Sequence, residues 1–154
     1  MTSLSCDVLT ALKGKVLVTA ESCTGGGIGA ALTAIPGSSE VYKGGVISYT
    51  NWVKNRILGV DEGLLDREGA VSSAVAEAMA AGARKVLGAD VAVSVTGLAG
   101  PGGDDRGNPV GTVYIGYSCE KLTISRKFLF EGDRDAVRRQ AVQSALCLIL
   151  EMNS

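Results

Sequence analysis

The chain of 154 residues contains no histidine. Without an imidazole it cannot form a Ser-His-Asp or Cys-His catalytic arrangement, a histidine general base or a zinc site with histidine ligands. The sequence also has no apolar run near the roughly 18 to 20 residues that a membrane-spanning helix needs, so we expect no contact with a membrane. Any chemistry must therefore use hydroxyl, thiol, amine or carboxylate groups.

Charge and cysteine spacing narrow the class of protein further. Lys and Arg total 15 against 16 Asp and Glu, with no basic cluster, so we do not expect a nucleic-acid partner. The four cysteines lack CxxC spacing, and the opening MTSLSCDVLT has no secretory signal, which predicts a cytoplasmic protein with reduced thiols. The apolar share of 46% in so short a chain predicts a well-packed core and favours a homo-oligomer.

The order of the expected elements indicates the fold class. Helices and strands alternate early in the chain, and two late strands form a hairpin around Glu120-Lys121. We therefore expect residues 1–154 to form a single α/β domain with three layers, α/β/α, and a mixed, mostly parallel sheet. The expected strands are 15–19, 41–50, 90–96, 112–118 and 124–130, and the expected helices are 3–13, 28–35, 51–58, 71–87 and a last one from residue 133.

Two of these strands end in glycine-rich turns. One reads TAESCTGGG (19–27) and the other VTGLAGPGG (95–103). Ligands usually bind at the carboxyl edge of such sheets, and the backbone amides there, or the helix start after Thr24, can hold an anion. The alternative is close packing of helix on strand without a ligand. Neither turn matches a P-loop or GxGxxG, so hydrolysis of a nucleoside triphosphate is not expected.

The window 38–54 combines many hydroxyl groups with the amine of Lys54. A neutral lysine can activate a hydroxyl as a nucleophile without histidine. If a helix begins near Asn51, Lys54 lies in its first turn, where the helix dipole disfavours the charged amine. The alternative is a solvated lysine on the surface.

A rival pair of candidate nucleophiles, Ser22 and Cys23, follows the first strand. A thiolate at Cys23, beside a helix start, would have a lowered pKa, and Ser22 precedes it. The alternative is that both side chains only contact the backbone or a ligand. Glu21 could bind a ribose hydroxyl or an amide, or cap the helix. Three arginines of the last helix, Arg134, Arg138 and Arg139, could hold a phosphate or form a polar face. For Arg139 the polar face is the preferred interpretation.

Six motifs follow one another over nearly the whole chain. They are TAESCTGG (19–26), GSS with SYTNWVK (37–54), GAVS (69–72), TGLAGPGG (96–103), NPVGTVYI (108–115) and GDRDAVRRQA (132–141). Together and in this order they resemble the C-terminal domain of the CinA family. The resemblance implies a nicotinamide-nucleotide amidohydrolase, which cleaves the carboxamide of nicotinamide mononucleotide to nicotinic acid mononucleotide and ammonia. A non-catalytic nucleotide-binding or competence-linked regulatory module is the alternative.

The resemblance also implies roles for individual residues. The matching catalytic positions are Ser39, Tyr49 and Lys54. In the expected mechanism neutral Lys54 takes the proton of Ser39, Tyr49 orients the pair or relays the proton, and an acyl-enzyme forms. The scheme needs no cofactor and no metal, and amides of Gly44-Gly45 or of the turn at Ser22 would stabilise the oxyanion. The residues expected to hold the nucleotide are Ser22, Thr24, Gly25, Gly45, Gly97, Gly100 and Arg134.

Overall fold

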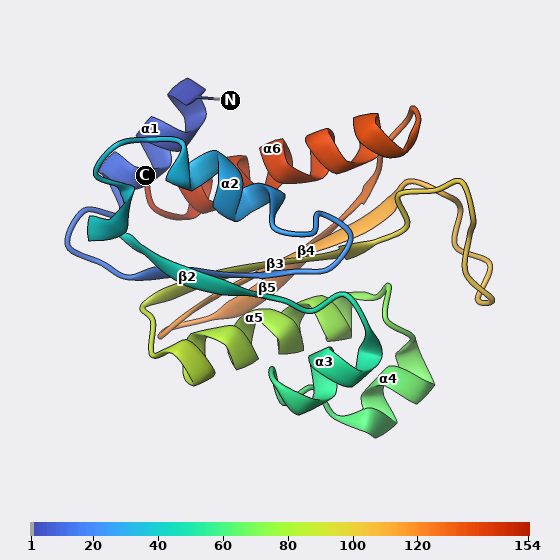
Figure 1. Cartoon of the computed structure of the whole chain (residues 1–154). Helices are drawn as coiled ribbons and strands as arrows, with labels where there is room; N and C mark the ends of the chain where they lie inside the picture. The colour runs from blue at the N-terminus through green and yellow to red at the C-terminus, as the bar shows by residue number, and fades with distance from the viewer. Residues whose placement is uncertain (1) are drawn as a thin grey trace.

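The computed structural model describes residues 2–154 and has a five-stranded sheet between two layers of helices (Figure 1). The strand order is β2-β1-β3-β4-β5. The strands are β1 (Leu17–Glu21), β2 (Tyr42–Ile47), β3 (Val91–Gly97), β4 (Thr112–Cys119) and β5 (Thr123–Leu129). The helices are α1 (Thr2–Ala11), α2 (Gly27–Thr33), α3 (Asn51–Arg56), α4 (Glu62–Glu68), α5 (Ser73–Leu87) and α6 (Arg134–Met152), with a short 3-10 turn, η1 (Ser38–Glu40).

The pairing of the strands confirms the expected mixed sheet. β1 pairs in parallel with both β2 and β3, whereas β4 runs antiparallel to both β3 and β5. The hairpin expected around Glu120-Lys121 joins β4 to β5. Parallel neighbours need a crossover connection, which the helices between β1, β2 and β3 provide, whereas antiparallel neighbours such as β4 and β5 need only a tight turn. The alternating helices and strands early in the chain and the two late strands therefore form one mixed sheet.

Each face of the sheet has its own layer of helices. Figure 1 shows α1, α2 and α6 on one face and α3, α4 and α5 on the other. The first layer buries a large core against β1, β3 and β4, including Leu32 and Leu146, and the second packs Met79 and Val75 of α5 against the other face. The three expected layers are therefore confirmed. Helix α4 was not expected from the sequence; Asp61 caps it by accepting a hydrogen bond from the amide of Leu64.

Parallel pairing brings three loops to one edge of the sheet. Glu21, the last residue of β1, pairs with Ile47 at the end of β2 and with Val95 near the end of β3. The turn after β1, the connection from β2 to α3 and the loop after β3 therefore leave the sheet side by side. This is the edge at which the glycine-rich turns were expected to form a site.

Within residues 2–154, no helix is both long and apolar enough to cross a membrane.

Candidate active site

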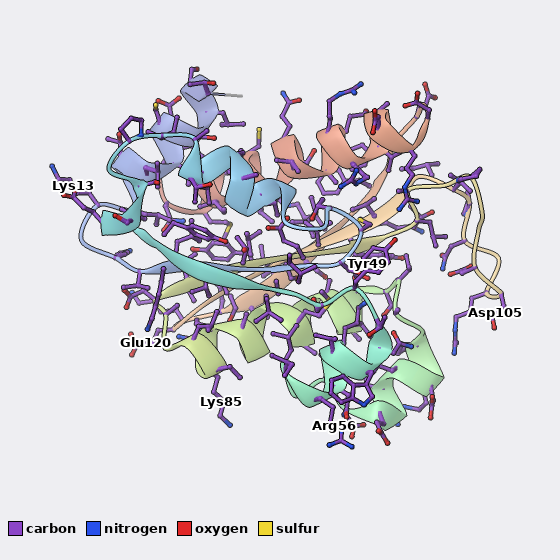
Figure 2. All side chains as sticks on the ribbon, viewed as in Figure 1. Lys13, Tyr49, Arg56, Lys85, Asp105 and Glu120 are labelled. Atoms are coloured by element: carbon purple, nitrogen blue, oxygen red, sulfur yellow. The ribbon has the colours of Figure 1, made fainter. Side chains whose placement is uncertain are left out.

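A cavity of about 720 Å³ opens at this edge of the sheet. Its walls come from the turn after β1, the start of α3, the loop between β3 and β4, and Arg134 at the start of α6. Figure 2 shows Tyr49 where β2 ends, with Asp105 at the tip of the β3–β4 loop that projects from the body of the molecule. Segments far apart in the sequence thus surround one concave space, as binding sites usually require.

Lys54 and Ser22 contact each other in the wall of this cavity. The side chain of Lys54 is only 2% exposed. Its Nζ donates hydrogen bonds to Ser22 Oγ at 3.0 Å and to the backbone oxygen of Ser48 at 2.8 Å. Ser22 is buried and follows β1 directly. A buried amine in contact with a hydroxyl that lines a cavity is an arrangement suited to nucleophilic catalysis.

Burial changes the protonation of this amine. It lowers the pKa of Lys54 from its ordinary 10.5 to about 8, because the charged form loses its hydration in the protein interior. α3 begins at Asn51 after the Thr50 cap, which confirms the expected position of Lys54 near a helix start. The alternative of a solvated surface lysine is wrong, and burial lowers the pKa where we had expected the helix dipole to do so.

The structure does not bring Ser39 to Lys54. Ser39 is exposed in η1, before β2, whereas Lys54 follows β2. A strand of this length separates its two ends by roughly 17 Å, at about 3.3 Å per residue. Ser39 is also absent from the cavity wall, so the expected Ser39–Lys54 pair is corrected: the hydroxyl next to the amine belongs to Ser22.

Cys23 lines the same cavity but is poorly suited to act as the nucleophile. Burial raises the pKa of its thiol to about 11, and the nearby charges of Lys54 and Arg138 offset only part of this effect. The thiol is therefore protonated at neutral pH, whereas the thiolate is the reactive form. The expectation that the helix start would lower this pKa is wrong, because burial dominates.

The start of α2 is occupied by a side chain of the protein itself. The Glu21 carboxylate, 2% exposed, accepts hydrogen bonds from the amides of Ile28 at 2.8 Å and Gly29 at 3.0 Å. It also accepts one from Thr24 Oγ1 at 2.7 Å. Glu21 is thus a cap, one of its three expected roles. The expected anion site at this helix start is wrong, because Glu21 occupies its amides, and the Thr24 side chain bonds Glu21.

Four of the seven residues expected to hold the nucleotide line the cavity. They are Ser22, Gly97, Gly100 and Arg134. Thr24, Gly25 and Gly45 do not. Gly45 lies within β2, where an added Cβ would meet Thr19 Oγ1 at 2.2 Å, so this glycine is needed for close packing of β2 on β1. The expectation that Gly25 and Gly45 touch the substrate is therefore corrected, as is the suggestion that Gly44-Gly45 supplies the oxyanion donors.

Tyr49 and Arg134 join two walls of the cavity. Arg134 Nη2 donates a hydrogen bond to the Tyr49 hydroxyl at 3.1 Å, and its Nη1 donates to the Gly100 oxygen at 2.7 Å. The start of α6 is thereby fixed to the end of β2 and to the glycine-rich loop. Tyr49 is 56% exposed, so its ring stands at the entrance of the cavity.

Arg106 is a cavity residue that the sequence analysis missed. It lies on the β3–β4 loop and donates hydrogen bonds to the backbone oxygens of Asp66 and Arg67, in the last turn of α4. Asp104 holds the loop by accepting bonds from the amides of Arg106 and Asn108. These contacts depend on the path of an irregular loop, for which the sequence carries no periodic signal.

Comparison with known proteins identifies the family. Residues 2–153 match the family described as the CinA C-terminal domain. A CinA-like protein of Synechococcus sp. (strain RCC307) is 50% identical over 153 residues, which cover 96% of this chain and 36% of that protein. The chain thus spans about a third of that relative's length.

A second relative has nearly the same length. The protein named nicotinamide-nucleotide amidohydrolase PncC from Pseudomonas putida is 47% identical over 138 residues, covering 90% of this chain and 86% of that protein. Among solved structures, a competence or damage-inducible protein from Enterobacter asburiae has a TM-score of 0.96 at 37% identity, covering 99% of this chain and 98% of that chain. The chain belongs to the CinA C-terminal domain family.

Proposed function

We propose that this protein is a nicotinamide-nucleotide amidohydrolase, which converts nicotinamide mononucleotide and water to nicotinic acid mononucleotide and ammonia. The observation that carries the proposal is the contact between the buried amine of Lys54, with its lowered pKa, and Ser22 Oγ in the cavity wall. The similarity to the Pseudomonas putida amidohydrolase, over most of both chains, supports the choice of substrate.

In the proposed first half-reaction, Lys54 is the base and Ser22 the nucleophile. The neutral amine takes the proton of the Ser22 hydroxyl while the oxygen attacks the carboxamide carbon. The carbonyl electron pair moves to oxygen, giving a tetrahedral intermediate. When this intermediate collapses, the carbon–nitrogen bond breaks, and the leaving group takes the proton from Lys54 to depart as ammonia. An ester of Ser22 with the pyridine carboxyl group remains.

In the second half-reaction, water replaces ammonia. Lys54, neutral again, takes a proton from the water that attacks the ester. The ester bond then breaks, Ser22 recovers a proton from Lys54, and the acid is released. The net change is amide plus water to acid plus ammonia, and the residues named here require no cofactor and no metal.

The rest of the cavity would hold the nucleotide. Its volume of about 720 Å³ lies within the roughly 300–1,000 Å³ of ordinary ligand sites. Arg134 supplies a cation for the substrate phosphate, and Gly97 and Gly100 let the backbone approach the ligand closely. Tyr49, bonded to Arg134, would orient that side of the site. We also propose that the protein acts in the cytoplasm and forms a homo-oligomer.

Ammonia release tests the function directly. The purified protein is incubated with nicotinamide mononucleotide, ammonia is measured by a coupled assay, and nicotinic acid mononucleotide is identified by chromatography. The proposal expects the two products in equal amounts and no ammonia from Lys54→Met. A protein that binds the nucleotide without releasing ammonia would instead be the non-catalytic module considered as the alternative.

A further inference from the structure

Two buried amide groups directly after Ser22 have no hydrogen-bond acceptor in another residue. Cys23 and Thr24 are 5% and 1% exposed. Among residues 2–154, neither of their N–H groups donates to another residue, although the neighbouring amides of Ser22 and Gly25 donate to Val95 and Ser22. Buried backbone donors are nearly always paired. Two consecutive exceptions beside the proposed nucleophile therefore call for an explanation.

Arg138 of α6 fixes the direction of the peptide group that carries the Thr24 amide. Its Nε donates a hydrogen bond to the Cys23 oxygen at 3.1 Å, and its Nη2 donates to the Thr24 oxygen at 3.3 Å. In a planar trans peptide the C=O of one residue and the N–H of the next point in opposite directions. Because Arg138 holds the Cys23 oxygen, the Thr24 N–H points away from Arg138.

The two sides of the turn face different spaces. Arg138 and Thr24 line a small pocket of about 230 Å³ between the start of α2 and α6, and Arg138 takes no part in the wall of the large cavity. Ser22 and Cys23 line the large cavity. The Cys23 carbonyl is thus held on the side of α6, which leaves the Thr24 amide free for the side of Ser22.

We infer that the amides of Cys23 and Thr24 form the oxyanion hole, and that Arg138 is the positioning residue that directs the Thr24 amide. This inference rests on the proposed amidohydrolase activity. When Ser22 Oγ attacks the carboxamide carbon, the carbonyl oxygen becomes negative and accepts hydrogen bonds from both amides. The charge returns to the carbon–oxygen bond as the carbon–nitrogen bond breaks and ammonia leaves.

A role of Arg138 in holding phosphate makes a different prediction. An arginine that binds the substrate phosphate contributes to binding in the ground state, so its loss raises KM. A residue that directs oxyanion donors acts on the transition state and lowers kcat. Arg138 takes no part in the cavity wall and already donates to two backbone oxygens, which favours the second role.

The experiment compares nicotinamide mononucleotide with its thioamide analogue, in which sulfur replaces the carboxamide oxygen. Sulfur accepts hydrogen bonds weakly, so the thioamide gains little from an oxyanion hole. Ammonia release is measured for both substrates with the parent protein, Arg138→Ala and Arg138→Lys. Arg139→Ala is the matched control, because Arg139 is the next residue of α6 and its side chain is exposed.

In Arg138→Ala, we expect kcat for the amide to fall about 100-fold with KM within about threefold, the size seen when one oxyanion donor is lost. The thioamide should lose much less, so the amide-to-thioamide rate ratio falls at least about tenfold. Arg138→Lys, which keeps one cationic donor, should lie between Arg138→Ala and the parent and also covers the case in which the alanine variant fails to fold. Arg139→Ala should match the parent.

Two results with an active parent would overturn the inference while leaving the proposed function intact. Equal losses of kcat for both substrates, and hence an unchanged amide-to-thioamide ratio in both variants, would mean general structural damage. A raised KM at unchanged kcat would make Arg138 a substrate-binding residue. A parent protein that releases no ammonia rejects the proposed function itself and the inference with it.

Discussion

The amine of Lys54 lies 3.0 Å from the hydroxyl of Ser22, although 32 residues separate them in the chain. The contact exists because β1 and β2 are parallel neighbours, so that the turn carrying Ser22 and the helix carrying Lys54 leave the same edge of the sheet. The backbone oxygen of Ser48, which follows β2, accepts a second bond from the amine and fixes its position. Fold topology, and not proximity in the sequence, decides which hydroxyl the amine can activate.

Removing the Ser22 hydroxyl should abolish most of the activity. We expect Ser22→Ala to lower kcat for nicotinamide mononucleotide at least about 100-fold, because no other hydroxyl in residues 2–154 is hydrogen-bonded to the Lys54 amine. Ser118→Ala is the control, since its buried hydroxyl bonds Thr123 at the hairpin end of β4. Should Ser39→Ala be inactive while Ser22→Ala stays active, the nucleophile would be the one that the family resemblance implies.

The pH dependence of the activity should follow the Lys54 amine. Only the neutral amine can take a proton, and its pKa in the folded protein is about 8. We therefore expect kcat/KM to rise about tenfold per pH unit below this value and to level off above it. The measurement is a series of initial rates from pH 6 to 10, with the far-UV circular dichroism checked at each pH. A profile that is flat or falls over this range contradicts a lysine base.

Lys54 should also make the fold less stable at neutral pH. Its lowered pKa corresponds to roughly 3 kcal/mol of cost for holding the charged amine in the interior at pH well below 8. Lys54→Met removes this cost together with two hydrogen bonds, so we expect the free energy of unfolding at pH 7 to rise by about 1–2 kcal/mol. Urea denaturation of both proteins measures the difference.

The sign of this effect can be checked by raising the pH. Between about 8 and 10.5 the folded protein has released the Lys54 proton and the unfolded chain has not, so the parent gains stability with rising pH. The difference in the free energy of unfolding between Lys54→Met and the parent should therefore become smaller over this range. A constant difference between pH 7 and pH 10 would mean that Lys54 does not carry the expected cost.

The three layers of the fold, and the edge of the sheet at which the cavity lies, could be predicted from the sequence. Alternation in DVAVSVT and the cap at Thr50 are local signals, and β3 and α3 form where these signals place them. Glycine-rich turns at the ends of β1 and β3 predicted a cavity there, because parallel strands end together. The lysine was likewise found from composition, since a chain without histidine has few bases.

The pairing of side chains within the site could not be predicted in the same way. Ser39 is closer to Lys54 in the sequence, whereas Ser22 is closer to it in the structure. Only the strand order, which places β1 beside β2, decides which of the two serines contacts the amine. The role of Glu21 could not be decided from the sequence, because capping requires the first amides of α2 to lie beside the end of β1. Burial of Cys23, which reverses the expected direction of its pKa shift, depends on the packing of distant segments.

Glu21 should support both the stability of the fold and the geometry of Ser22, which follows it. Glu21→Ala would leave the Thr24 hydroxyl and the amides of Ile28 and Gly29 without their acceptor in a buried place. An unpaired buried donor costs about 1–3 kcal/mol, so with partial relaxation we expect the free energy of unfolding to fall by about 3 kcal/mol.

Glu21→Gln separates the hydrogen bonds from the charge. Its amide oxygen can still accept from Thr24 and Ile28, but its amino group would face the Gly29 N–H, so we expect a loss of about 1–2 kcal/mol. Urea denaturation checks both variants against Glu62→Ala, in which the exposed glutamate of the first turn of α4 is removed and the change should stay within about 0.5 kcal/mol. If Glu21→Ala is as stable as Glu62→Ala, the three bonds do not hold the start of α2, and the turn that carries Ser22 must be fixed mainly by the contacts of Arg138 with its carbonyl groups.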